Sequence, residues 1–304
     1  MWGAASHSVS RAEHQGSLKA VREAAPLTIS ASHSSSQLAS SNSTSLSRLV
    51  SYGPVVTQRP AVIPGPPAAV SFDFWHTLVS EPDGLLAKLR REAVLRALIE
   101  HDIEVEGEVL EAHLVAAQAL QTEAWEQGEH FEPTWAAAHL ADAIDGLEGP
   151  GHGRVVEAYL STGGTADVEL SPGAAGTLAS LAAEGVQLGI ICDVGLTGSR
   201  HLRRILDRAG VLCHFRGWAF SDEVGHYKPS SAIFRHMLDQ FELGEGDVVW
   251  HVGDLRRTDV AGARGSGLVP IRYRGIADDT SDAPEADLVI DNLSELTSLA
   301  RPSA

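Results

Sequence analysis

Apolar residues recur along this chain in two patterns, which predict strands and helices. A short apolar stretch over residues 69–78 brings Asp73 to the carboxyl end of a strand, and an apolar run followed by a polar turn is typical of a buried parallel strand. Between residues 84 and 160 the apolar residues recur at helical spacing. From residue 170 onward, short apolar runs alternate with helical stretches. Repeated strand–helix units predict an α/β fold with a Rossmann-like, mostly parallel sheet.

The limits of the expected elements follow from apolar spacing, glycines and prolines. In the helical region we expect helices over residues 84–101, 106–128, 132–144 and 154–160. In the alternating region we expect further strands over residues 186–191, 218–220, 248–252, 268–273 and 286–290. The helices that connect or follow these strands are expected over residues 174–183, 199–209, 231–241, 259–264 and 293–299.

The first 67 residues follow neither pattern. They contain fifteen serines and end in a proline-rich stretch over residues 60–67. A segment of this composition does not bury enough apolar surface to offset the entropy of ordering, so we expect residues 1–67 to be disordered. The scarcity of acidic residues also fits a transit peptide, but we favour an unstructured tail.

The overall composition excludes several classes of function. Of the 304 residues 43% are hydrophobic, and the formal net charge of −17 argues against binding to nucleic acid or to an anionic membrane. No apolar run approaches the roughly 20 residues that span a membrane. The two cysteines, Cys192 and Cys213, form neither a disulfide framework nor a zinc pattern. We therefore expect a cytoplasmic protein that is a monomer or a homodimer.

Four groups of polar residues stand at the ends of expected strands. The groups are Asp73, the pair Cys192 and Asp193, Lys228 before Pro229, and Asp254 with Asp259. Parallel sheets bind ligands beyond the carboxyl ends of their strands, so these groups are candidates for one site. Two carboxylates that close on one hard cation fit Mg²⁺, and a lysine lets an anionic substrate approach several carboxylates.

In order and spacing, the four groups resemble the motifs of the haloacid dehalogenase-like (HAD) hydrolase superfamily. The opening motif, Asp-x-Asp-x-Thr after a hydrophobic strand, stands here as Asp73-Phe74-Trp75-His76-Thr77. The metal motif stands as Gly253-Asp254, with Asp259 five residues after Asp254 and Gly262-Ala263 following. The resemblance extends from about residue 69 to the carboxyl terminus.

The resemblance implies a particular domain organisation. Residues 68–80 and 164–304 would form the α/β core, and residues 81–163 an all-helical cap that closes over the site, with Gly163-Gly164 as its return hinge. Trp125 and Trp135 lie within this cap, where we expect packing first and substrate contact second. A closing cap implies a small phosphorylated substrate, whose identity no motif fixes.

The resemblance also implies roles for individual residues. Asp73 would be the nucleophile that takes the phosphoryl group, and Lys228 would stabilise charge and bind the phosphate. Cys192 and Asp193 would contribute to substrate binding. Mg²⁺ would be held by Asp73, by the backbone carbonyl of Trp75, by Asp254 and by Asp259, the last directly or through water.

Two positions depart from the family pattern. Trp75 replaces the second Asp, which is the general acid, and Cys192 replaces a Ser or Thr that holds phosphoryl oxygens. An activated leaving group, or a proton from His76, would compensate for the missing acid. For His76 we favour packing or a turn hydrogen bond over catalysis, and for Cys192 a role as a small buried hydrophobe is about as favoured as substrate contact.

Three functions remain open from the sequence. We favour a Mg²⁺-dependent phosphatase, because the metal motif is intact. A 2-haloacid dehalogenase is the alternative enzyme, since a halide leaves without a proton, but that reaction needs no metal. The third reading is a catalytically degenerate module that binds a phosphorylated ligand.

Overall fold

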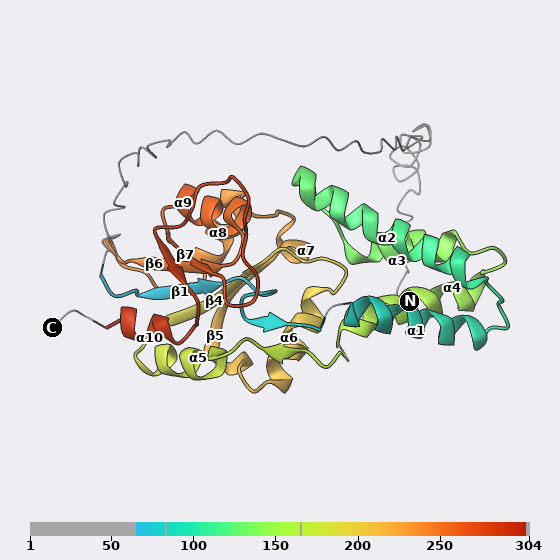
Figure 1. Ribbon diagram of the computed structural model, residues 1–304, viewed down its shortest axis with the longest axis horizontal. Coiled ribbons are helices and arrows are strands. Elements are labelled where there is room, and N and C mark those ends of the chain that lie inside the picture. Colours follow the sequence, from blue (N-terminus) through green and yellow to red (C-terminus); the bar gives the residue numbers. More distant parts are fainter. Residues whose placement is uncertain (1–64, 83, 165, 302–304) are drawn as a thin grey trace, which may run out of the picture. The chain divides into compact units, whose positions relative to one another are not determined.

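The computed structural model describes residues 65–82, 84–164 and 166–301 (Figure 1). The expected disorder of residues 1–67 therefore falls almost entirely outside the described residues. Among the described residues, no helix has both the length and the apolar character needed to cross a membrane.

A six-stranded sheet in the order β5-β4-β1-β6-β7-β8 forms the centre of the fold, and all neighbouring strands pair in parallel. The predicted α/β class and parallel sheet are confirmed. The strands are β1 (Ala69–Phe72), β4 (Gln187–Cys192), β5 (Phe215–Phe220), β6 (Val249–Gly253), β7 (Val269–Tyr273) and β8 (Leu288–Ile290). Strand β5 begins three residues earlier than expected. Arg216, which is exposed, and Gly217 interrupt the apolar run in the sequence.

Helices cover both faces of the sheet (Figure 1). Val70 and Phe72 of β1 face a cluster that contains α5 (Ala174–Ala183), α6 (Ser199–Arg208) and α10 (Glu295–Leu299). Ala69 faces the opposite cluster, to which α8 (Ser231–Leu238) and α9 (Ala261–Gly265) contribute. This alternation is the two-residue period of a strand buried on both faces. The short helix α7 (Ser221–Val224) follows β5 directly.

Residues 84–164, which we call the helical segment, pack around a hydrophobic cluster of their own. They form α1 (Leu85–Ile99), α2 (Gly107–Gln127), α3 (Pro133–Asp142), α4 (Gly149–Ser161) and a 3-10 turn (Thr162–Gly164). The cluster includes Val94, Leu140 and Val155, and it also takes in Leu196 and Tyr227 from beyond the segment. Packing therefore continues from the helical segment to the loops that follow β4 and β5.

Helix α4 begins five residues before the expected start at residue 154. Three glycines in its first turns weaken the sequence pattern, but Pro150 suits the first turn of a helix. A Cβ on Gly151 would lie 3.2 Å from a side-chain carbon of Leu147 and 3.3 Å from one of His101. Close tertiary packing therefore overrides the low helix propensity of this stretch.

Two further differences concern short elements. Strands β2 (Val79–Ser80) and β3 (Glu169–Leu170) form a separate antiparallel pair that flanks the helical segment, and neither is long enough to show a periodic pattern. The helix expected over residues 259–264 begins at Arg256, as a π-helical turn (Arg256–Val260) that runs into α9. The wider turn places Asp259 inside the helical run instead of at its amino end.

Candidate active site

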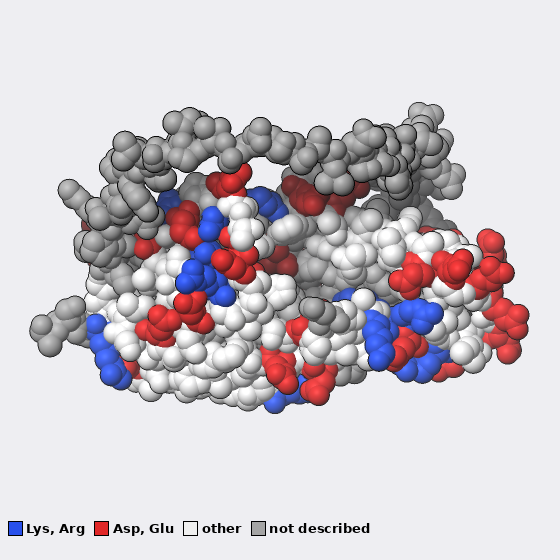
Figure 2. All heavy atoms as spheres, viewed as in Figure 1, with Lys and Arg blue, Asp and Glu red and all other residues white. Residues whose placement is uncertain are grey.

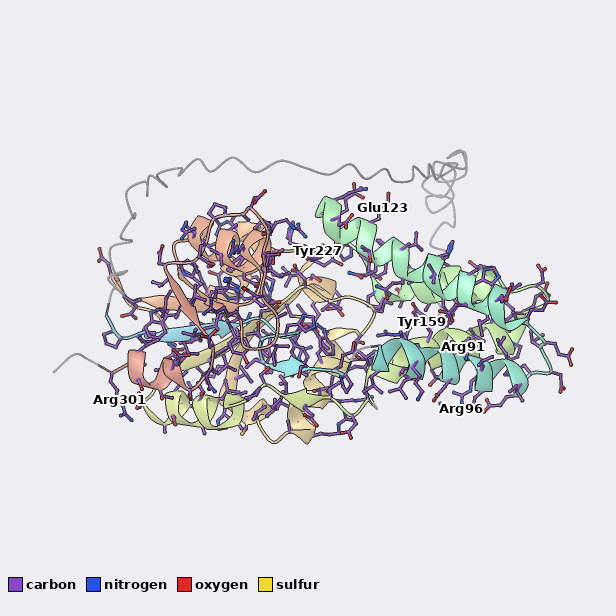
Figure 3. All side chains as sticks on the ribbon, in the orientation of Figure 1. Arg91, Arg96, Glu123, Tyr159, Tyr227 and Arg301 are labelled. Carbon is purple, nitrogen blue, oxygen red and sulfur yellow. The ribbon has the colours of Figure 1, made fainter. Side chains whose placement is uncertain are left out.

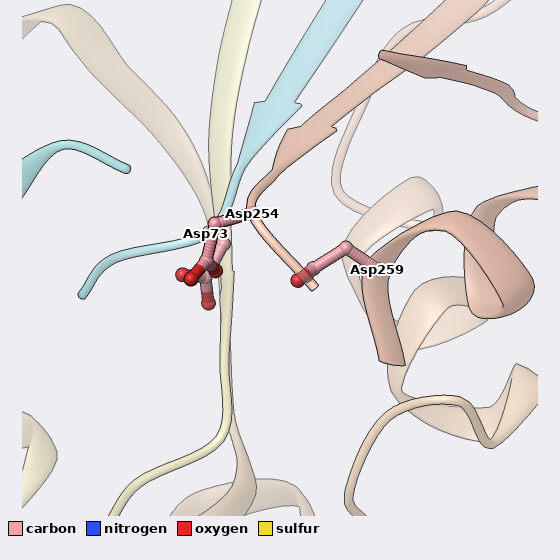
Figure 4. A group of neighbouring side chains, drawn as sticks. All are labelled: Asp73, Asp254 and Asp259. Carbon is pink, nitrogen blue, oxygen red and sulfur yellow. The ribbon is translucent and has the colours of Figure 1, made fainter. Parts of the chain in front are cut away.

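Three carboxylates meet beyond the carboxyl ends of β1 and β6. Phe72 pairs with Val252, and the backbone N–H of Asp73 donates to the Val252 carbonyl (2.8 Å), so Asp73 and Asp254 leave adjacent strands side by side. Asp259 reaches the same point from the π-helical turn (Figure 4). One ligand atom from each carboxylate lies within 4.8 Å of the others, and all three residues are buried.

Lys228 joins two of these carboxylates. Its Nζ lies 2.5 Å from Asp73 Oδ1 and 2.6 Å from Asp259 Oδ1, and its side chain is 2% exposed. The structure thus brings Asp73, Lys228, Asp254 and Asp259 together, although Asp73 and Lys228 are 155 residues apart in the chain.

Burial and mutual charge set the protonation of this group. Burial raises the pKa of Asp73 to about 6, with Lys228 acting in the opposite direction. Burial and the negative charges of Asp73 and Asp259 raise the pKa of Asp254 to about 8. Burial opposes the ionisation of Asp259, yet Lys228 and His251 hold its pKa below the ordinary value. Burial also disfavours the ammonium of Lys228, but Asp259 and Asp73 raise its pKa well above that of a free lysine.

Asp259 is held in place by a chain of buried, hydrogen-bonded polar side chains. His251 of β6 places its Nε2 3.0 Å from Asp259 Oδ1, while its Nδ1 lies 2.9 Å from Ser71 Oγ of β1. A Cβ on Gly253 would lie 2.2 Å from Asp259 Cγ, so only glycine leaves room for the carboxylate. Ser71 and His251 are polar residues at buried strand positions, which was the sequence signal that could have identified them.

The turn after Asp73 carries Trp75 and His76. Trp75 is half-buried against the sheet cluster and contacts Phe74 edge to face, with ring centroids 5.1 Å apart. His76 adopts a left-handed backbone conformation (φ 56°), and its half-exposed ring places Nδ1 3.8 Å from Asp254 Oδ2. An indole offers no acidic proton, so His76 is the titratable side chain of this turn.

Cys192 and Asp193 end β4 beside the carboxylates. Cys192 is 1% exposed, and burial followed by the charge of Asp73 raises its pKa well above the ordinary thiol value, which keeps the thiol protonated. Both oxygens of Asp193 have protein partners: Oδ1 accepts from the Lys228 backbone N–H (2.8 Å) and Oδ2 from Trp125 Nε1 (3.1 Å). Asp193 therefore links the Trp125 side chain to the Lys228 backbone.

The sequence did not predict the contacts that Trp125 and Arg257 make beside Asp193. Trp125 of α2 reaches Asp193, and the guanidinium carbon of Arg257 lies 4.2 Å from the centroid of the Trp125 ring. Tyr227, which Figure 3 marks near the last turns of α2, donates to the Val194 carbonyl (3.2 Å). Trp135, in contrast, is half-exposed and contacts the rings of His130 and Phe131.

The donor set fits a hard divalent cation. All three clustered side chains offer carboxylate oxygens, which such cations prefer, and one ammonium faces three carboxylates. Burial and the charges of Asp73 and Asp259 raise the pKa of Asp254 to about 8, so its ionised form is disfavoured without a further cation. A divalent cation would supply the missing positive charge. Acidic and basic side chains are interspersed over the face of the molecule that Figure 2 shows.

Comparison with known proteins assigns the chain to a family. A family model for haloacid dehalogenase-like hydrolases matches residues 67–267. The phosphoglycolate phosphatase of Rhodospirillum rubrum is 30% identical over 204 residues, which are 66% of this chain and 77% of that protein.

Several solved structures share the fold. A 2-haloacid dehalogenase from Pseudomonas syringae pv. Tomato matches with a TM-score of 0.57 at 21% identity, over 76% of this chain and 96% of its own. A HAD phosphatase from Thermococcus onnurineus matches with a TM-score of 0.53 at 22% identity, over the same shares of the two chains. A magnesium-bound HAD hydrolase from Bacillus subtilis matches with a TM-score of 0.53 at 16% identity, over 77% of this chain and 98% of its own. The chain is a hydrolase and belongs to the haloacid dehalogenase-like hydrolase family.

Proposed function

We propose that the protein is a Mg²⁺-dependent phosphatase that hydrolyses a small phosphorylated metabolite through a phosphorylated Asp73. The observation that carries the proposal is the ammonium of Lys228 between Asp73 and Asp259, with Asp254 in the same carboxylate cluster. A dehalogenase has no need of a three-carboxylate cluster of this kind. The 30% identical phosphoglycolate phosphatase supports the same reaction class.

In this proposal Asp73 attacks phosphorus, the ester oxygen leaves, and water then cleaves the acyl phosphate. Lys228 stabilises charge on the phosphoryl oxygens and keeps Asp73 ionised despite its burial. Cys192 supplies only a weak S–H donor toward the phosphoryl group. Asp193 contributes by fixing the Lys228 backbone.

Asp73, Asp254 and Asp259 would hold the metal together with the backbone carbonyl of Trp75, and Mg²⁺ suits these hard oxygen donors. When bound, Mg²⁺ neutralises the carboxylates and the phosphoryl oxygens, so that one anion can approach another. The helical segment would act as a cap, because Trp125 reaches into the site from α2. Such a cover restricts the substrate to a small molecule.

The leaving group distinguishes this enzyme from relatives that carry an acid at position 75. General acid catalysis contributes about 10²–10⁴-fold, and Trp75 has no proton to donate. We therefore propose that the substrate has a good leaving group, such as an acyl or aryl phosphate. His76, whose ring faces Asp254, is the alternative proton donor.

The test is phosphate release from a panel of acyl, aryl and alkyl phosphates, with Mg²⁺ or with EDTA. We expect Mg²⁺-dependent release from the activated esters, and its loss in Asp73→Asn. An unchanged rate in Asp73→Asn would reject the nucleophile, and no release from any ester would reject the phosphatase. His76→Gln separates the two proton sources, because it slows only the alkyl esters if His76 is the acid.

One observation favours a second candidate. Trp75 removes the group that a phosphatase uses and a dehalogenase does not need, so the same Asp73 would be able to displace halide from a 2-haloacid. Halide release that is insensitive to EDTA, in the absence of phosphate release, would establish this reaction instead.

A further inference from the structure

Arg90 places a charge on the buried face of α1. This helix buries Leu86, Arg90 and Val94 at four-residue intervals, which is the stripe that an amphipathic helix turns inward. Arg90 is 7% exposed. A guanidinium therefore occupies a position at which the helix otherwise carries apolar side chains.

The buried charge of Arg90 has no counter-ion in contact with it. Among the described residues no carboxylate lies within 4.0 Å of the guanidinium, and Nε has no hydrogen-bond partner. Its hydrogen bond runs from Nη2 to Thr197 Oγ1 (2.6 Å), and the Tyr159 ring centroid lies 5.8 Å from the guanidinium carbon. By comparison, the equally buried Arg272 binds Glu285 and Asp278.

A cavity of about 330 Å³ adjoins this guanidinium. Arg90, Tyr159 and Gln118 line it from α1, α4 and α2, and Leu196 lines it from the loop after β4. Figure 3 shows Tyr159 in the space between these helices. Burial lowers the pKa of Arg90, while Tyr159 and the charge of Glu81 act in the opposite direction.

We propose that this cavity is a binding site for a small oxyanion, a carboxylate or phosphate group held by Arg90, whose guanidinium Thr197 positions from behind. A planar guanidinium matches such a group with two parallel hydrogen bonds. Thr197 Oγ1 accepts a hydrogen bond from Arg90 Nη2 and so fixes the orientation of the guanidinium at the cavity. A bound anion would offset the cost of the buried charge and would join α1 to the loop that begins after Asp193.

Two sources can supply the oxyanion. The first is a second anionic group on the substrate itself, and this case rests on the proposed function. The second is a separate anionic metabolite that binds whether or not the enzyme turns over. The chemistry of the site is the same in both cases, so the experiment has a binding arm and a kinetic arm.

The binding arm measures the affinity of sulfate for the metal-free protein in EDTA, by calorimetry at constant ionic strength. Without metal, three carboxylates against one lysine repel anions from the catalytic site, so sulfate reports on Arg90. Wild type should bind saturably, and Arg90→Met should bind at least about tenfold more weakly, because a charged hydrogen-bond pair is lost. Arg96→Met removes the same charge from the exposed side of α1 and should bind as wild type does.

Unfolding in chloride buffer distinguishes a ligand site from a structural clamp. Without sulfate, Arg90→Met should be at least as stable as wild type, because an uncompensated buried charge is replaced by an apolar side chain. Equal sulfate affinity in wild type and Arg90→Met would overturn the proposal, with or without a loss of stability. Should Arg90→Met fail to fold, Thr197→Val carries the test, since it removes the hydroxyl that positions Arg90, retains the shape and should weaken sulfate binding.

The kinetic arm compares an aryl phosphate with a phosphate ester that also carries a carboxylate. If the oxyanion belongs to the substrate, Arg90→Met raises KM for the carboxylate ester about tenfold and leaves the aryl phosphate unchanged. If the oxyanion is a separate metabolite, sulfate alters kcat for the aryl phosphate in wild type and not in Arg90→Met. Failure of the phosphatase proposal would leave the binding arm intact, so the two failures are distinguishable.

Discussion

Trp125 donates its indole N–H to Asp193 Oδ2 across 3.1 Å, and this bond joins α2 to the loop that follows β4. The other oxygen of Asp193 accepts the backbone N–H of Lys228 (2.8 Å), and the Lys228 ammonium contacts Asp73. A continuous chain of hydrogen bonds therefore leads from the helical segment to the proposed nucleophile. We expect the position of α2 to influence the position of Lys228 beside Asp73.

Trp125→Phe should lower kcat by about tenfold to a hundredfold, because the substitution removes a hydrogen bond to a buried carboxylate that holds Lys228. An aromatic ring for Arg257 to contact is retained, so KM should change less than kcat. Steady-state kinetics with an aryl phosphate measures both constants.

The matched control is Trp135→Phe, which makes the same change at a half-exposed position of α3 and should behave as wild type. Adding Asp193→Asn to Trp125→Phe should cost little beyond the larger single effect, because both substitutions interrupt the same chain. Additive losses in the double variant would contradict the coupling.

Removal of one acidic charge should affect stability in opposite directions with and without metal. In EDTA, Asp254→Asn should raise the free energy of unfolding by about 1 kcal/mol or more, because it removes an acid whose pKa burial and the neighbouring charges of Asp73 and Asp259 raise to about 8. With Mg²⁺ the wild type should gain stability in proportion to the logarithm of the metal concentration, and Asp254→Asn should gain much less.

Thermal unfolding across a Mg²⁺ titration measures both effects. The exposed Asp145→Asn is the control and should keep the full response to metal. If the wild-type melting temperature does not change with Mg²⁺, or if Asp254→Asn retains the full increase in melting temperature, these residues are not the metal ligands.

Gly253→Ala should displace the Asp259 carboxylate, because the new methyl carbon would lie 2.2 Å from Asp259 Cγ if nothing moved. Overpacking of this kind costs about 1–3 kcal/mol, and the displaced Asp259 should also weaken metal affinity. Gly176→Ala in α5 meets no atom within 4 Å and should instead stabilise the helix by about 0.5–1 kcal/mol. Urea unfolding measures the change in the free energy of unfolding for both variants. Equal changes in the two variants would refute the steric argument.

His201 should make stability depend on pH. Burial, with Arg200 and Arg204, lowers its pKa from 6.5 to about 4. Between these values the unfolded chain binds a proton that the folded chain does not, so stability rises with pH. The contribution is complete above about pH 6.5 and is lost as the pH falls toward 4.

Urea unfolding between about pH 4 and pH 7, for wild type and His201→Asn, isolates this contribution. The difference between the two proteins should shift in favour of wild type as the pH rises through this range. A difference that does not vary with pH would show that His201 titrates in the folded protein as it does in the unfolded chain.

The sequence was sufficient to predict that the four groups of polar residues lie together, because parallel strands bring their carboxyl ends to one edge. Asp73 and Asp254 follow apolar runs directly, and their proximity depends only on β1 and β6 being neighbours. Lys228 and Asp259 follow from the motif order. The α/β class and most of the helices also follow from apolar spacing.

Other features depend on tertiary contacts that have no local signal. Arg90 lies on a helix whose apolar spacing is recognisable without it, and only packing against Thr197 shows that its side chain is buried. Trp125 and Trp135 are equivalent in the sequence, and the structure separates them by the direction in which α2 and α3 face. The glycine-rich start of α4 is helical because of its neighbours.

The position of β1 in the sheet has a consequence for the order in which the protein can become active. Both neighbours of β1 are synthesised much later, because β4 ends at residue 192 and β6 at residue 253. During synthesis, the strand that precedes Asp73 has no neighbours to pair with until β4 and β6 have been made. A nascent or carboxyl-truncated chain would therefore carry Asp73 without Lys228, Asp254 and Asp259, and the proposed site is complete only when both neighbouring strands are present.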